Sequence, residues 1–266
     1  MILRNHALMK SDLALKIAHR GAAKYLPENT LPAFLAAFEE YGAEGIEFDV
    51  KLSKDGVPVI FHDDCLERVT NGRGLVSNYT LEELQKLDAA YWFDPEEKCR
   101  YALRGKGFQI PTLESLFRAL GSRLYCVEIK DPVPGLVDKI VLLAESYGVL
   151  ERCIMGSFHD VIFRKLRKTY PHVPAFLSRR RVLMLLLEYS WNRSRPKKEP
   201  NLVASLPVTS PLFTFNHRHW IEFLHRKGIR VFFWTINQPE LMKELAENGA
   251  DGLMSDDPGL LRDTLT

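Results

Sequence analysis

Eight charged side chains stand at or near the ends of short apolar stretches, and together they could perform acid–base and metal chemistry. They are His19, Arg20, Glu47, Asp49, His62, Asp63, Glu128 and Lys130. Burying charged groups within apolar stretches is costly, so a cluster of this kind indicates a functional site that uses their charge. The set includes two imidazoles, a group of three carboxylates and two cations, which metal-assisted chemistry on a phosphate requires.

The three carboxylates of that group point to a bound divalent cation. Side chains alternate along a strand, so Glu47 and Asp49 share one face, and Glu128 from the next barrel strand can complete a ring. Without a cation the charges would repel one another, and at least one carboxylate would hold a proton. An all-oxygen set without cysteine favours Mg²⁺ or Ca²⁺ over a structural Zn²⁺, and the sequence does not choose between the first two.

The two histidines suit paired acid–base catalysis. We expect His19 and His62 on either side of a phosphorus atom, where one removes a proton from the nucleophile and the other donates one to the leaving oxygen. Arg20 and Lys130 would supply the further positive charge that the transition state demands.

Hydrophobic periodicity predicts the elements that must position these residues. We expect eight strands, near 15–19, 46–50, 125–129, 153–156, 174–177, 202–205, 230–234 and 251–254. Helical patterns lie between them, at 30–41, 113–120, 136–147, 159–170, 181–191, 217–227 and 239–248, with a short one from residue 259. Strands alternating with helices over such a length predict a (β/α)8 TIM barrel, whose functional sites lie at the carboxyl ends of the strands.

The stretch before His62 needs a different arrangement, because only four residues separate it from the second strand. That connection is too short for a parallel crossover, so the stretch must return antiparallel. The dipeptide Asp55-Gly56 signals a two-residue hairpin that would place Asp49 opposite His62, and a bulge near Pro58 would shift this pairing by one residue. Residues 63–108 would then form a folded insertion over the barrel mouth.

The composition fits one domain over residues 1–266. Hydrophobic residues make up 46% of the 266 residues, enough for one large core. A net charge of +2, with no arginine-rich stripe, argues against a nucleic-acid partner. No apolar run approaches the roughly 18 residues of a membrane span, and residues 1–16 have no apolar leader, so we expect a soluble, cytoplasmic protein. A closed barrel implies no dimer, and the oligomeric state stays open.

The order of these motifs resembles the glycerophosphodiester phosphodiesterase family. The resemblance rests on His19-Arg20-Gly21-Ala22, Pro27-Glu28-Asn29-Thr30, Glu47-Phe48-Asp49-Val50, His62-Asp63 and Glu128-Ile129-Lys130, in the family's order. Weaker matches extend toward the end of the chain, where Ser255 of Ser255-Asp256-Asp257-Pro258 stands in place of the family's threonine. Four ordered charge motifs at strand ends are hard to obtain by chance.

The resemblance implies hydrolysis of a small-molecule glycerophosphodiester to sn-glycerol 3-phosphate and an alcohol, through a cyclic phosphate that water then opens. The implied roles are catalysis for His19 and His62, metal binding for Glu47, Asp49 and Glu128, and substrate binding for Arg20, Lys130 and Trp234. Trp234 would pack against the glycerol end of the substrate or be ordinary core. Asn29 would bind substrate or cap the helix near Thr30, and the pattern favours the cap.

Other functions stay open. Residues 179–198 hold seven basic side chains against one acidic side chain, around the apolar run 182–187. This pattern suits a peripheral membrane contact, although it favours an ordinary barrel helix followed by a solvated basic loop. Membrane contact would favour lipid substrates, as for a lysophospholipase D or a phosphoinositide-type phosphodiesterase. A barrel that only binds phosphate esters is disfavoured, because binding alone requires neither an acid nor a base.

Overall fold

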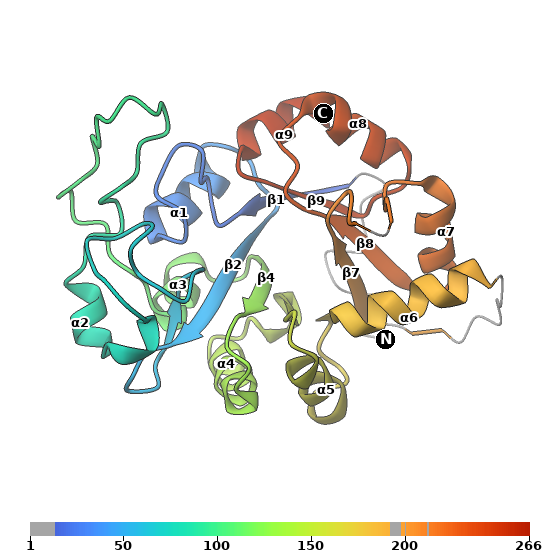
Figure 1. Ribbon diagram of the computed structural model, residues 1–266, viewed down its shortest axis with the longest axis horizontal. Helices are drawn as coiled ribbons and strands as arrows, with labels where there is room; N and C mark the ends of the chain where they lie inside the picture. The colour runs from blue at the N-terminus through green and yellow to red at the C-terminus, as the bar shows by residue number, and fades with distance from the viewer. Residues whose placement is uncertain (1–13, 192–197, 200, 212) are drawn as a thin grey trace.

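The described residues form eight parallel strands that close into a barrel, which confirms the predicted (β/α)8 TIM fold (Figure 1). The computed structural model describes residues 14–191, 198–199, 201–211 and 213–266. The barrel strands are β1 (Leu15–His19), β2 (Gly45–Leu52), β4 (Leu124–Ile129), β5 (Cys153–Gly156), β6 (Ala175–Phe176), β7 (Leu202–Leu206), β8 (Ile229–Phe233) and β9 (Gly252–Ser255). Because β1 pairs with both β2 and β9, the sheet closes.

Helices follow the strands and cover the outside of the barrel (Figure 1). They are α1 (Leu31–Glu39), α3 (Leu113–Leu120), α4 (Pro134–Ser146), α5 (Asp160–Thr169), α6 (Arg179–Ser190), α7 (Arg218–Arg226), α8 (Pro239–Glu247) and α9 (Pro258–Thr264). Helix α6 begins two residues before its predicted start, because the hydroxyl of Ser178 accepts the backbone N–H of Arg181 and caps the helix. None of the described helices is long and apolar enough to cross a membrane.

Alternation along the strands produces two cores. On β2, Ile46, Phe48 and Val50 face outward into the larger core beneath the helices, whereas Glu47 and Asp49 face into the barrel. The barrel interior has its own apolar cluster, which includes Leu15, Ile17, Leu124, Cys126, Ile154, Phe176, Val203, Phe232 and Met254. Glu47, Asp49 and Glu128 occupy the carboxyl-end layers of β2 and β4, where this apolar filling stops.

The hairpin of β2 and β3 (Pro58–Ile60) returns antiparallel, as predicted, but its register differs by one residue. Val50 lies opposite Ile60, and Ser53 rather than Lys54 pairs with Val57 across the turn. The turn therefore has three residues and ends at Gly56, whose φ of 77° lies in the left-handed region that such a bulged turn requires. The two-residue turn was wrong because Ser53 accepts the N–H of Val57 through its hydroxyl and favours the longer loop.

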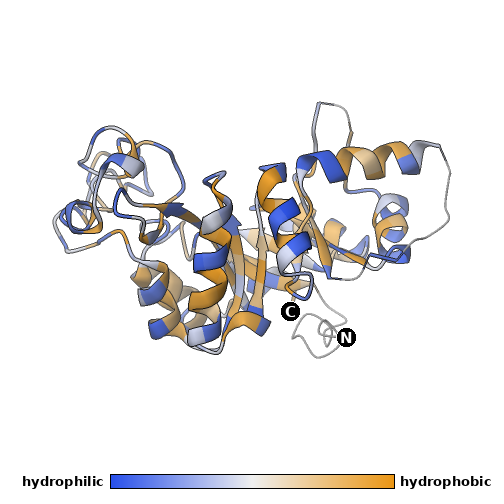
Figure 2. Cartoon of the chain, turned by 90° about the horizontal axis from the view of Figure 1, so that it is seen from below, coloured by the Kyte–Doolittle hydropathy of each residue, from blue (hydrophilic) through white to orange (hydrophobic). Residues whose placement is uncertain are grey.

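Between β3 and α3 the chain forms the short helices η3 (Val76–Asn78) and α2 (Leu81–Gln85). A capping box between Thr80 and Glu83 stabilises the start of α2. Apolar side chains of this segment pack into a small core with Val59 and Phe61. In Figure 2 this segment and α6 stand at opposite ends of the molecule, on either side of the barrel.

Candidate active site

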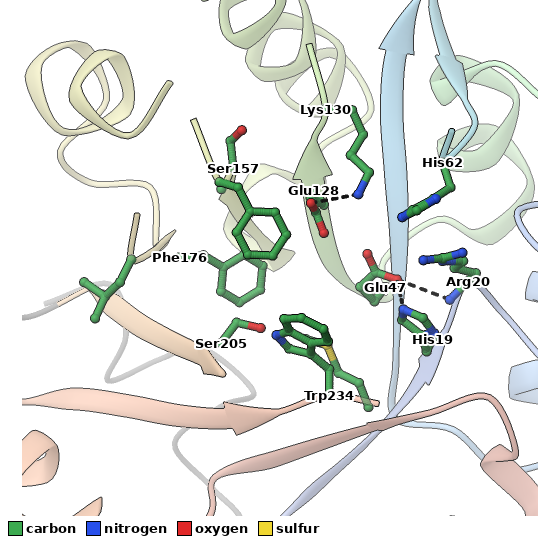
Figure 3. A pocket seen from close by; sticks show the side chains of 14 residues that line it. His19, Arg20, Glu47, His62, Glu128, Lys130, Ser157, Phe176, Ser205 and Trp234 are labelled. Carbon is green, nitrogen blue, oxygen red and sulfur yellow. Dashed lines mark hydrogen bonds and ion pairs between the residues drawn. The ribbon is translucent and has the colours of Figure 1, made fainter. Parts of the chain in front are cut away.

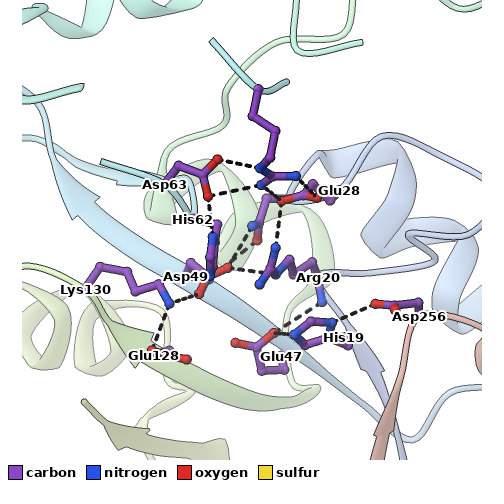
Figure 4. Close-up of polar contacts among 12 residues, drawn as sticks. His19, Arg20, Glu28, Glu47, Asp49, His62, Asp63, Glu128, Lys130 and Asp256 are labelled. Carbon is purple, nitrogen blue, oxygen red and sulfur yellow. Dashed lines mark hydrogen bonds and ion pairs between the residues drawn. The ribbon is translucent and has the colours of Figure 1, made fainter. Parts of the chain in front are cut away.

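Charged side chains of three neighbouring strands meet at one mouth of the barrel (Figure 4). His19 at the end of β1 pairs in register with Glu47 on β2, and Asp49 pairs with Glu128 on β4. Side chains at paired positions face the same way, so these four lie in two adjacent layers of the mouth. Arg20 and Lys130 follow directly on β1 and β4, His62 and Asp63 come shortly after β3, and all four lie in the same group.

The carboxylates Glu47, Asp49 and Glu128 each offer an oxygen within 4.8 Å of the others. Asp49 accepts a hydrogen bond of 2.9 Å from Asn29 Nδ2 and lies 3.1 Å from Lys130 Nζ and 3.3 Å from Arg20 Nε. Burial alone would raise the pKa of Asp49, but these cations outweigh it and the pKa is lowered. Lys130 Nζ also donates to Glu128 Oε1, at 2.9 Å.

Glu47 differs from Asp49 and Glu128, each of which is paired with a lysine or arginine side chain. Its side chain is 6% exposed, and no lysine or arginine side chain of the described residues forms an ion pair with it. The nearest donors are the backbone N–H of Arg20 at 3.3 Å and His19 Nε2 at 3.8 Å. Burial, followed by repulsion from Asp49, raises the pKa of Glu47 to about 8. A divalent cation would relieve this repulsion, and the three oxygen donors fit a hard ion such as Mg²⁺ or Ca²⁺.

His19 is oriented by a carboxylate from the far end of the chain. Its Nδ1 lies 2.7 Å from Asp256 Oδ1, just beyond β9. Burial alone would lower the pKa of His19, but the hydrogen bond to Asp256 and the nearby Glu47 outweigh it and raise the pKa above 6.5. Asn237 in turn fixes Asp256: its Nδ2 donates to Asp256 Oδ2 at 2.8 Å, and its Oδ1 accepts the backbone N–H of Asp256 at 3.0 Å.

His62 has a matching partner, Asp63, whose Oδ1 lies 2.5 Å from its Nδ1. Arg68 donates to Asp63 from Nε and holds Glu28 with both Nη atoms, at 2.8 and 2.6 Å. Glu28 also accepts from Arg20 Nη1 at 3.0 Å. A continuous chain of charge-assisted bonds therefore joins the second histidine to the arginine beside the carboxylates (Figure 4).

Asn29 does not cap α1, contrary to the sequence-based prediction. The cap is Thr30, whose hydroxyl accepts the N–H of Ala33. Asn29 adopts the left-handed conformation, with φ of 56°, and its buried amide donates to Asp49. Asparagine tolerates that conformation better than most residues, which suits it to turn its side chain from the loop onto the carboxylate.

One cavity of about 190 Å³ joins the charged cluster to an apolar wall (Figure 3). His19, Arg20, Glu47, His62, Glu128 and Lys130 line one side, and Phe176 and Trp234 lie across from them. The apolar lining also includes Phe158, Leu177 and Met254. The ring of Trp234 meets that of Phe158 edge to face, with centroids 6.0 Å apart. Trp234 therefore lies at the cavity, where the resemblance placed it. The division suits a ligand with an anionic group and a less polar remainder.

Three positioning residues were missed from the sequence: Glu28, Arg68 and Asp256. Glu28 and Asp256 belong to motifs already noted, but no local pattern shows what they touch. Asp256 had one usable signal, because it follows the last barrel strand and barrel closure sets that strand beside β1. Arg68 lies in the segment between β3 and α3, for which the sequence offered no pairing rule.

Comparison with known proteins agrees with this geometry. The sequence model of the glycerophosphoryl diester phosphodiesterase family matches residues 19–260. A glycerophosphodiester phosphodiesterase of Caldanaerobacter subterraneus subsp. tengcongensis is 34% identical over 252 residues, covering 93% of this chain and 96% of the relative. A human lysophospholipase D is 27% identical over 278 residues, covering 95% of this chain and 86% of the relative.

Among solved structures, a phosphodiesterase of Oleispira antarctica in complex with the product sn-glycerol-3-phosphate superposes with a TM-score of 0.74 at 25% identity. The match covers 95% of this chain and 96% of that one. The family match spans nearly the whole barrel and includes every residue of the charged cluster, beginning at His19. The chain therefore belongs to the glycerophosphoryl diester phosphodiesterase family.

Proposed function

We propose that this enzyme hydrolyses glycerophosphodiesters to sn-glycerol 3-phosphate and an alcohol by paired acid–base catalysis at the barrel mouth. The observation that carries the proposal is the pair of histidines. Each is tied through Nδ1 to its own carboxylate, and both line the cavity that Glu47 and Glu128 also line. The product bound to the relative from Oleispira antarctica supports the same reaction.

Glu47, Asp49 and Glu128 would hold one divalent cation, Mg²⁺ or Ca²⁺. Bound there, the ion supplies positive charge for a non-bridging phosphate oxygen and for the transition state. Support for this role comes from Glu47, which is buried beside two other carboxylates with its pKa raised to about 8. The backbone amide of Arg20 and the ring of His19 lie against Glu47 and keep its carboxylate directed into the mouth.

His19 and His62 would exchange protons with the reacting oxygens. Because Nδ1 of each ring bonds to an aspartate, Nε2 is the nitrogen available to the substrate. One ring removes a proton from the glycerol hydroxyl that attacks phosphorus, and the other protonates the oxygen of the departing alcohol. Water would then open the cyclic phosphate with the two roles reversed, which gives sn-glycerol 3-phosphate. Asp256 and Asp63 stabilise the imidazolium that forms at each step and hold the tautomer with the proton on Nδ1.

Arg20 and Lys130 would bind the phosphate. Both line the cavity, and both are held in place by ion pairs: Arg20 to Glu28 and Asp49, Lys130 to Asp49 and Glu128. Cations fixed in this way need little reorganisation as negative charge develops on the phosphate oxygens. The wall around Trp234 would receive the less polar part of the substrate.

The test is release of sn-glycerol 3-phosphate from a panel of deacylated phospholipids, with Mg²⁺, with Ca²⁺ and with a chelator. We expect turnover that requires one of the ions and is lost in the chelator. His19→Ala and His62→Ala should each abolish turnover. Full activity in the chelator, or in either alanine variant, would contradict the mechanism.

A second candidate substrate is a lysophospholipid, because the apolar wall formed by Phe158, Phe176 and Trp234 could also receive part of an acyl chain. The human relative named as a lysophospholipase D makes this comparison worthwhile. Glycerophosphocholine and lysophosphatidylcholine should be assayed side by side. A clear preference for the acylated substrate would replace the first candidate with the second.

A further inference from the structure

Helix α6 is apolar on two opposite faces, and only one of them packs on the barrel. Val182, Leu186 and Tyr189 pack against the main core around the fully buried Leu185. The opposite side, here called the outer face of α6, presents Leu183, Met184, Leu187 and Trp191, which are 49%, 46%, 46% and 64% exposed. Spacings of one, four and eight residues place these four side chains along a single stripe. An ordinary barrel helix would carry polar residues there.

Positive charge lies at the start of the outer face. Arg179 and Arg180 in the first turn of α6 are exposed, as is Lys198, which follows α6 in the chain, and none of them takes part in an ion pair among the described residues. Arg181 behaves differently, since it is half-buried and pairs with Glu188 and Glu199. The sequence adds Arg193, Arg195 and Lys197, which lie outside the described residues. An apolar stripe with unpaired cations beside it is typical of helices that lie in a membrane interface.

The outer face continues to the rim of the active-site cavity. Only Leu177 and Ser178 separate β6 from α6, so the helix starts at the carboxyl-end mouth of the barrel. The guanidinium of Arg179 lies over the ring of Phe158, 4.5 Å from its centroid, and Phe158 lines the cavity. Figure 2 shows α6 as a largely apolar helix at the edge of the molecule.

We propose that the outer face of α6 binds the barrel to an anionic lipid surface. Leu183, Met184, Leu187 and Trp191 would enter the headgroup region, and Arg179 and Arg180 would contact lipid phosphates. Tryptophan is enriched at this depth of a membrane. A second copy of the chain fits less well, because four half-exposed side chains fall far short of the roughly 20–30 residues a side that a stable protein interface uses.

Lipid binding by the outer face does not depend on the proposed function. The consequence that binding would turn the active-site cavity toward lipid substrates does rest on the proposed function. The test is co-sedimentation with vesicles of phosphatidylcholine alone and of phosphatidylcholine mixed with phosphatidylglycerol. We expect the protein to bind the mixed vesicles at least roughly tenfold more tightly, since each basic residue near an anionic surface adds to the attraction. The double variant Leu183→Asp and Leu187→Asp should lose at least about tenfold of this binding.

Matched variants make the result specific. Leu142→Asp changes an exposed leucine on α4 that is 63% exposed and lies away from α6, and it should bind like the unmodified protein. Arg179→Gln with Arg180→Gln should remove the preference for phosphatidylglycerol. Glycerophosphocholine turnover should be unchanged in the Leu183→Asp, Leu187→Asp protein, which separates lost membrane binding from lost folding or catalysis. The proposal would be overturned if the Leu183→Asp, Leu187→Asp protein bound vesicles as well as the unmodified protein, or if the unmodified protein did not bind vesicles. It would also be overturned if the unmodified protein were a dimer that these two substitutions dissociate.

Discussion

The substitution Asp256→Asn tests the most specific feature of the site, the orientation of His19. Asn237 cannot turn its amide, because its Oδ1 accepts the backbone N–H of residue 256 at 3.0 Å and the hydroxyl of Ser255 at 2.9 Å. Its Nδ2 therefore continues to donate toward position 256. An asparagine there must direct its oxygen to Asn237 and its NH₂ group to Nδ1 of His19. This arrangement forces the proton of His19 onto Nε2, where it blocks acceptance of a proton from the substrate.

The expected loss has two parts. Exchanging a charged hydrogen bond for a neutral one costs about 1–1.5 kcal/mol, or roughly tenfold in rate. The wrong tautomer adds about a hundredfold more, so kcat should fall on the order of 10³-fold, equivalent to about 4 kcal/mol. KM should change little, because Asp256 does not line the cavity next to Trp234. The pKa of His19 should fall when the hydrogen bond that its Nδ1–H donates to the Asp256 carboxylate is lost.

The double variant Asp256→Asn with Asn237→Ala sharpens the test. Without the donor at position 237, the new asparagine can turn its oxygen to His19 and restore the tautomer. The double variant should therefore be roughly a hundredfold faster than Asp256→Asn alone. Steady-state release of choline from glycerophosphocholine measures the rates, nitrogen NMR of the His19 ring reports the tautomer, and Asn237→Ala alone is the control. Activity of Asp256→Asn within about twofold of the unmodified enzyme, or no recovery in the double variant, would refute this reasoning.

Three further predictions concern other parts of the molecule. Asp63→Asn should reduce kcat by at least tenfold, because Arg68 donates to the oxygen of the new amide and leaves its NH₂ group facing His62. An unchanged kcat would contradict this prediction. Gly21→Ala should lower the free energy of unfolding by more than about 2 kcal/mol, since φ is 85° and the new Cβ would lie 2.8 Å from the backbone of Ala33. Gly105→Ala, with φ of 71° and open space around it, is the control that measures backbone strain alone, and equal losses would exclude the steric part. Burial alone would raise the pKa of Asp251, but hydrogen bonds and charges from neighbouring cations lower it, so the stability it adds is present above about pH 4 and is lost as the pH falls further. In urea unfolding, the difference in free energy of unfolding between the unmodified protein and Asp251→Asn should therefore shrink below about pH 4. A difference that grows below that pH would contradict the prediction.

The barrel was predictable because the hydrophobic periodicity of each barrel strand and helix can be read from its own short stretch of sequence. Strand β2 is an apolar run interrupted by carboxylates at alternate positions, β4 is one that carries a single carboxylate near its end, and a parallel barrel brings the ends of such strands to one mouth. The predicted cluster therefore followed from strand order alone. His62 reached the mouth despite the wrong register, because it lies beyond the end of β3, outside the paired residues whose faces the register sets.

What the sequence did not predict are contacts between distant loops. His19 and Asp256 are 237 positions apart, and Glu28 and Arg68 are 40 apart. Such pairs depend on the precise path of loops after the strands, which hydrophobic periodicity does not encode. Asn29 was misread for a related reason: its neighbour Thr30 is an equally good cap, and only the left-handed backbone at Asn29 turns its amide toward Asp49.

The central claim is that three carboxylates hold a cation while two histidines move protons beside it. The most direct measurement is Mg²⁺ and Ca²⁺ affinity by calorimetry, set against turnover, for Glu47→Gln, Glu128→Gln, His19→Ala and His62→Ala. We predict that the glutamine variants lose both metal affinity and turnover, whereas the alanine variants lose turnover and keep metal affinity nearly intact. Equal loss of affinity in all four variants, or unchanged affinity in the glutamine variants, would contradict the claim.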